Sequence, residues 1–199
     1  MGPSRKPSGI LAAALATMLF PAAMAAPPDP PAPPAPPPPP GPAGQTNVKT
    51  DLVGYNETPL TLNSPGSGTF EASIQKDGSS ITYKLTYTAL SSAITQAHIH
   101  FGAPAITGQI VLFLCTNLTP PFGVPTPPPC PSPSGTVTGT LTAADVIARP
   151  TQGIDAGTAG FAEMLDAIDA GAAYANVHTV TFPGGEIRAR LDSHGPGPN

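Results

Sequence analysis

Charged residues are scarce in this 199-residue chain: only 10% of its residues are Asp, Glu, Lys or Arg, and it has no Trp. Lys and Arg together number 8, against 12 Asp and Glu. Arg5 and Lys6 fall in a segment that we expect to be removed, which leaves 6 basic against 12 acidic residues and a net charge of −6. Because phosphate binding depends on clustered Lys and Arg, we expect no nucleic-acid partner.

Cysteine is almost absent too. The two cysteines, Cys115 and Cys130, bracket a Pro-rich insertion over residues 116–134. In an exported chain, two cysteines that close one loop predict a disulfide. Two free thiols, or a thiolate metal site, are the alternative.

Long apolar runs are lacking except near the N-terminus. Arg5 and Lys6 precede an apolar stretch over residues 10–20, and Ala23-Met24-Ala25 follows as a small-x-small cleavage site. This pattern predicts a signal peptide over residues 1–25. The alternative is a retained anchor, but the stretch is shorter than the roughly 20 apolar residues that a span needs. We therefore expect an exported protein, periplasmic, cell-surface or secreted, with no membrane span in the mature chain.

Proline, in contrast, is abundant, with 30 residues beside 21 Gly. Residues 26–45 are almost entirely Pro, Ala and Gly, a composition that favours a solvated polyproline II segment. It is either a stiff tether or a disordered linker that binds nothing. Residues 193–199, which include His194, are predicted to form a flexible tail.

The intervening region, residues 46–192, is expected to be one domain built mainly of strands. The apolar pattern predicts two short helices, one beginning at Thr142 with Asp145 in its first turn, the other carrying Phe161, Met164, Leu165 and Ile168 at helical spacing. The nearly continuous apolar run over 109–115 predicts a central strand buried on both faces. Alternating side chains predict the remaining strands over residues 48–55, 68–76, 81–90, 95–101, 135–141, 172–180 and 186–191.

Three of these strands each carry a pair of polar residues two positions apart. The pairs are His98 and His100, Asn176 and His178, and Glu186 and Arg188. Alternate residues of a strand share a face, so each pair points to one side. If the three strands are neighbours, the pairs form one polar cluster.

Six segments in this order resemble the CHRD domain, which is named after the animal protein chordin and also occurs in exported microbial proteins. The match covers roughly residues 46–192, with Ala189 where the family commonly has Gly. It implies an all-β fold, and we expect a Greek-key-like antiparallel β-sandwich with one or two short inserted helices. The segments are Gly54-Tyr55-Asn56-Glu57-Thr58-Pro59, Ala97-His98-Ile99-His100-Phe101-Gly102, Gly108-Gln109-Ile110-Val111, Gly135-Thr136-Val137-Thr138-Gly139, Ala173-Tyr174-Ala175-Asn176-Val177-His178-Thr179 and Gly184-Gly185-Glu186-Ile187-Arg188-Ala189-Arg190-Leu191.

The histidine pair suggests metal chemistry. The segment around His98 and His100 is also similar to the paired-histidine strand of Cu/Zn superoxide dismutases. Imidazoles are good ligands for copper and zinc, so His98, His100 and His178 are candidate ligands. Glu186 is a candidate fourth ligand, or it orients an imidazole.

The alternative is a closed polar network with no ion. In it Glu186 bridges Arg188 and an imidazole, and Asn176 satisfies backbone groups.

We expect a noncatalytic extracytoplasmic module that binds a protein or a surface component and has no catalytic residue. A copper-dependent redox enzyme of the superoxide dismutase type is the alternative function.

Overall fold

The computed structural model describes residues 46–120 and 122–193, together with Gly2. The expected signal peptide, the Pro-rich tether and His194 lie outside the described residues. The described strands are β1 (Thr46–Val53), β2 (Ser67–Ile74), β3 (Ile81–Thr88), β4 (Ile94–Phe101), β5 (Gln109–Thr116), β6 (Gly135–Leu141), β7 (Ala173–Thr179) and β8 (Ile187–Leu191). The helices are the 3₁₀ turns η1 (Gly54–Asn56), η2 (Ala143–Asp145) and η3 (Pro150–Gln152) and the α-helix α1 (Gly157–Asp169).

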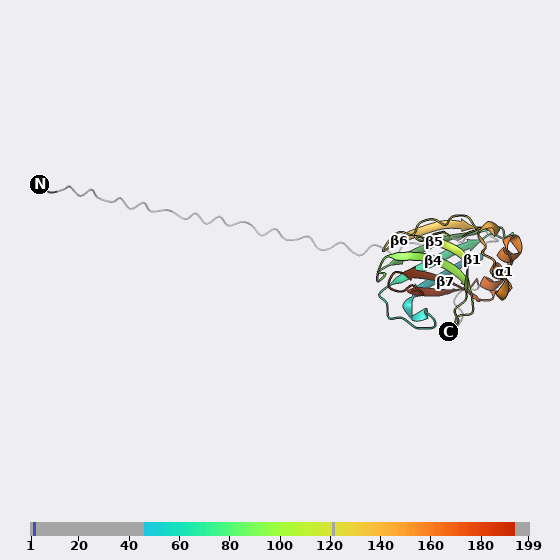
Figure 1. The fold of residues 1–199 in the computed structure, drawn as a ribbon, viewed down its shortest axis with the longest axis horizontal. Helices are drawn as coiled ribbons and strands as arrows, with labels where there is room; N and C mark the ends of the chain where they lie inside the picture. The colour runs from blue at the N-terminus through green and yellow to red at the C-terminus, as the bar shows by residue number, and fades with distance from the viewer. Residues whose placement is uncertain (1, 3–45, 121, 194–199) are drawn as a thin grey trace, which may run out of the picture. The chain divides into compact units, whose positions relative to one another are not determined.

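The strands form one antiparallel sheet in the order β5-β4-β7-β8-β1-β2-β3-β6. Figure 1 shows the neighbouring strands β5, β4 and β7 of this order. Its two four-stranded halves meet where Val53 of β1 pairs with Arg188 of β8. The chain passes between the halves from β3 to β4, from β5 to β6 and from β6 to β7, as a Greek-key-like sandwich requires. The expectation of an all-β, antiparallel, sandwich-like fold is confirmed.

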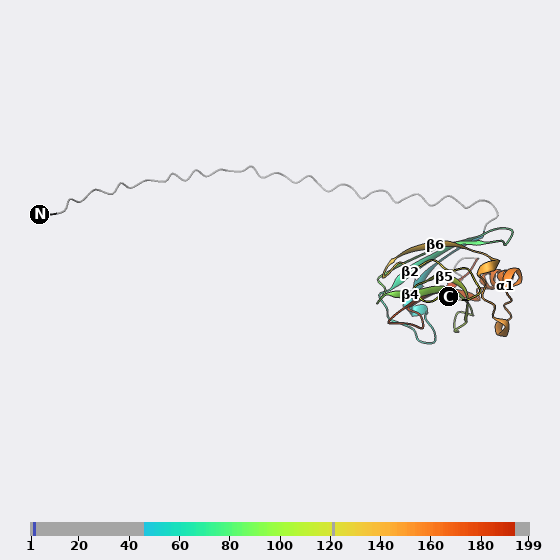
Figure 2. The same cartoon turned by 45° about the horizontal axis from the view of Figure 1, so that its top comes forward.

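The two halves face each other across the hydrophobic core. Figure 2 shows β2 and β6 in one layer, β4 and β5 in the other, and α1 at one end. Tyr83 of β3 spans the interior, and its hydroxyl donates a 2.5 Å hydrogen bond to the backbone carbonyl of Leu114 in β5. The predicted second helix is α1, which buries Phe161, Met164 and Ile168.

The prediction for β5 was wrong in one respect, because β5 lies at an end of the sheet rather than in its centre. Five of its eight residues are buried nonetheless, since other segments cover its free edge. The Ile147 backbone N–H donates to the carbonyl of Val111, and the Arg149 side chain donates to the carbonyl of Ile110. A continuous apolar run therefore reports burial of a strand, not its place in the order.

The predicted disulfide between Cys115 and Cys130 is formed, and both residues are buried. The helix expected after Thr142 is the single 3₁₀ turn η2. Its predicted cap is present, because the Thr142 backbone N–H donates to the Asp145 carboxylate and the Thr142 hydroxyl accepts from the Ala144 N–H. No helix in the described part of the chain is long and apolar enough to span a bilayer.

Candidate metal centre

Strands β4, β7 and β8 lie next to one another, so the three polar pairs come from neighbouring strands. His98 pairs with Asn176 across β4 and β7, and Asn176 pairs with Arg188 across β7 and β8. Ile99 and Val177 point to the opposite face and are fully buried in the core. The alternation in each strand thus gathers polar side chains on the outer face of this half of the sandwich.

The three histidines form the only group of potential metal ligands found among the described residues. One ring nitrogen from each of His98, His100 and His178 lies within 4.8 Å of the others. Two nitrogens bound to one ion at about 2.0–2.1 Å lie at most about 4.2 Å apart, so nitrogens separated by 4.8 Å would have to approach by at least about 0.6 Å to share an ion. The register between β4 and β5 shifts on either side of His98 and Ile99, where β5 carries the extra residues Leu114 and Val111, and such bulges re-aim side chains of the bulged strand.

Backbone carbonyls orient two of these rings. Nδ1 of His100 lies 3.0 Å from the carbonyl oxygen of Gly108, and Nδ1 of His178 lies 3.0 Å from that of Pro183. A carbonyl oxygen can only accept a hydrogen bond, so each Nδ1 carries the proton and each Nε2 presents its lone pair. Both Nε2 atoms are buried and have no hydrogen-bond partner among the described residues, and the same holds for both ring nitrogens of His98.

Burial keeps the histidines neutral. It lowers the pKa of His100 to about 4 and lowers that of His178. The pKa of His98 falls well below its usual value because of burial and then because of the neighbouring His178 and His100. Neutral imidazoles with free lone pairs are the form that binds a metal ion.

Two aromatic rings contact the cluster, and neither was anticipated from the sequence. Phe113 of β5 meets His98 edge to face, with ring centroids 4.4 Å apart. Tyr174 of β7 stacks on His100 with centroids 4.6 Å apart. The signal for Tyr174 was available, since it precedes Asn176 and His178 at the same period of two.

Arg188 extends this stack on the far side of Tyr174. Its guanidinium carbon lies 3.5 Å from the centroid of the Tyr174 ring, a cation–π contact. The guanidinium also donates to the Thr58 hydroxyl and to the backbone carbonyls of Ala103, Pro104 and Ile106. Arg188 therefore ties the loop between β4 and β5 to the ring that covers His100.

The structure does not bring Glu186 to the histidines or to Arg188. Its buried carboxylate accepts hydrogen bonds from the hydroxyls of Ser64, Ser91 and Thr179 and from the Ser91 backbone N–H. Burial raises its pKa, but these hydrogen bonds outweigh burial and hold the pKa below its usual value. Glu186 precedes β8, which begins at Ile187, so the alternation of the strand does not govern its direction.

The carboxylate that does approach this face is Glu57, which the sequence analysis did not single out. Glu57 is 4% exposed, and both of its oxygens accept from Nδ2 of Asn176 at 3.0 Å. Burial raises the pKa of Glu57 to about 7. Gly185 packs against this pair with φ +125°, and a Cβ there would lie 2.5 Å from Oδ1 of Asn176. The sequence signal for Glu57 was its place in the first of the six segments.

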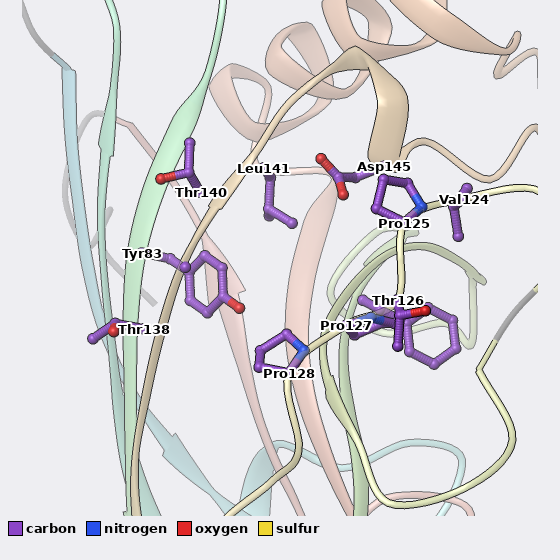
Figure 3. A pocket seen from close by; sticks show the side chains of 12 residues that line it. Tyr83, Val124, Pro125, Thr126, Pro127, Pro128, Thr138, Thr140, Leu141 and Asp145 are labelled. Carbon is purple, nitrogen blue, oxygen red and sulfur yellow. The ribbon is translucent and has the colours of Figure 1, made fainter.

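A separate hollow of about 390 Å³ lies under the disulfide-closed loop. Figure 3 shows Tyr83 and Leu141 on one side of it and the loop residues Pro125 and Pro128 on the other. Phe113, which contacts His98, also lines it.

Comparison with known families shows which domain contains the residues of the candidate centre. The family model of the CHRD domain matches residues 48–191. The chain belongs to the CHRD family. No curated protein and no solved structure matches the chain. The CHRD match contains all three histidines, Glu57, Asn176 and Arg188 as well as both cysteines, so the candidate centre lies inside the domain.

Proposed function

We propose that this CHRD protein is an exported, noncatalytic binding module whose three-histidine centre holds one copper or zinc ion. The observation that carries the proposal is the set of unpartnered ring nitrogens on His98, His100 and His178. A buried polar atom without a partner costs about 1–3 kcal/mol, and one metal ion would satisfy one nitrogen of each histidine, three of these four atoms.

The two carbonyl contacts support the same conclusion. Metal-bound histidines commonly donate their other ring N–H to a carbonyl, which fixes the tautomer and the ring direction. Gly108 and Pro183 supply such carbonyls to His100 and His178. A closed polar network would instead leave no lone pair free, and Glu186, its expected bridge, is bonded elsewhere.

Export is supported by the signal-like N-terminus and by the Cys115–Cys130 disulfide, since disulfides persist mainly in oxidising compartments. In that setting the module presents its surface to an extracytoplasmic protein or surface component. We favour binding over redox turnover because His98 is fully buried and His100 and His178 are each 6% exposed, which gives a substrate little access.

The test is metal content. The full chain, with its disulfide intact, is incubated with copper or zinc, desalted and assayed by elemental analysis, and we expect about one ion per chain. A His98→Phe variant that keeps the native near-UV circular dichroism should lose the ion, whereas His194→Ala, which changes the histidine outside the cluster, should keep it. A folded parent that retains no metal, or a folded His98→Phe variant that retains it, would refute the proposal.

A further inference from the structure

The candidate centre offers no negatively charged ligand. His98, His100 and His178 make up the whole ligand group that the described residues provide. The nearby carboxylates are engaged, Glu186 with three hydroxyls and Glu57 with the Asn176 amide. Three neutral imidazoles therefore leave the full charge of a bound ion uncompensated.

The surroundings add a positive charge, the Arg188 guanidinium, which the buried Glu57 carboxyl group partly offsets where it is ionised. The Arg188 guanidinium lies 3.5 Å from the Tyr174 ring, which stacks on His100. Phe113 closes another side with an apolar ring, and His98 is fully buried. Burial in a medium of low dielectric constant penalises an ion steeply, and the Born cost grows with the square of its charge.

From this charge balance we infer that the centre selects Cu(I) over Zn(II) and Cu(II). The inference rests on the proposed metal centre and adds the ion that it takes. Transfer of a monocation from water into the buried centre carries about one quarter of the Born cost of a dication of the same size, and a monocation feels half of the repulsion from Arg188. Because all three ligands are uncharged, no ligand charge offsets this difference.

Coordination number favours the same ion. Zn(II) held by only three protein ligands takes a water as its fourth, and the three histidines that supply the nitrogens here are at most 6% exposed, which limits the access of such a water. Cys115 and Cys130 cannot add a thiolate, since they are joined in the disulfide. Cu(I), a d¹⁰ ion that accepts three ligands, suits three imidazoles.

The experiment compares affinities in the full chain with its disulfide intact. Cu(I) is supplied as its acetonitrile complex under argon, without a thiol reductant, and is titrated against bicinchoninate. Zn(II) and Cu(II) are titrated against chelators of known affinity. We expect one Cu(I) per chain, bound at least about tenfold more tightly than either dication. Tighter binding of Zn(II) or Cu(II) would overturn the Cu(I) inference and leave the proposed function standing, whereas no binding of any ion would overturn both.

A charge variant tests the physical cause. Arg188→Gln removes the neighbouring cation, and Lys84→Gln removes an exposed cation on β3 as the matched control. Since a dication feels twice the repulsion, the gain in Zn(II) affinity should be about the square of the gain in Cu(I) affinity. The ratio of the two affinities cancels any general loosening of the site. An unchanged ratio in Arg188→Gln, or an equal change in Lys84→Gln, would overturn the electrostatic explanation.

Discussion

Replacing Glu57 by Gln should remove a pH dependence of folding that this one carboxyl group creates. Glu57 is 4% exposed, and burial raises its pKa from 4.5 to about 7. Between these two pH values the folded chain holds a proton on Glu57 that the unfolded chain has lost. The carboxyl group therefore favours folding below pH 4.5, and this contribution is lost as the pH rises to 7.

The size of the effect follows from the two pKa values. One pKa unit corresponds to about 1.36 kcal/mol, so the rise from 4.5 to about 7 makes ionisation cost about 3 kcal/mol of stability by pH 8. Gln has nearly the same shape and no charge, and its side-chain oxygen can still accept from Asn176. The Gln variant should thus gain about 3 kcal/mol relative to the parent between pH 4.5 and pH 8.

The assay is urea unfolding of parent and variant, both freed of metal by a chelator, at several pH values. Subtracting the two free energies of unfolding at each pH cancels the titration of every other group. Glu71→Gln is the control, because Glu71 pairs with Lys49 and the pKa of Glu71 is lowered, so its difference curve should slope the other way. A difference between Glu57→Gln and the parent that stays flat from pH 4.5 to pH 8 would refute the reasoning.

Three further predictions concern other parts of the fold. Tyr83→Phe should lose about 1–3 kcal/mol in urea unfolding, because the buried Leu114 carbonyl loses its donor. Replacing Cys115 and Cys130 by Ser should cost about 2–4 kcal/mol and lower the melting temperature, and an unchanged value would mean that the loop does not restrict the unfolded chain. The metal-free protein should lose stability as the pH falls from 6.5 to 4, since the unfolded chain protonates His100 first. Calorimetry at pH 5 and pH 7 checks this, and the loss should be smaller in a folded His100→Gln variant.

Most of the fold could be predicted because its strands alternate cleanly. The β3 segment places Ile81, Tyr83, Leu85 and Tyr87 on the core face, and all four are buried. The order of the strands could not be predicted, since periodicity reports which face of a strand is buried and not which strand lies beside it. Hence β5 was expected in the centre and lies at an end.

The candidate site could be predicted only where its residues sit inside strands. His98, His100, Asn176, His178 and Arg188 do, and the structure brings them to one face. Glu186 and Glu57 lie outside regular strands, where a local turn and not the period of two sets the direction of the side chain. Glu186 was therefore expected at the histidines and lies elsewhere, and Glu57 was not anticipated.

The histidine cluster is costly for the fold, and that cost argues for its function. The unpartnered nitrogens of His98, His100 and His178 are each buried, and each would cost about 1–3 kcal/mol. An apolar trio on the same strand face would avoid this cost, as Ile99 and Val177 do on the opposite face. A bound ion turns this destabilisation of the folded state into a stabilisation, since any ligand that binds only the folded state stabilises it. If the proposal is correct, a saturating metal ion should raise the melting temperature of the parent and leave that of folded His98→Phe unchanged. An equal rise in both proteins would place the ion elsewhere and leave the buried nitrogens without a function.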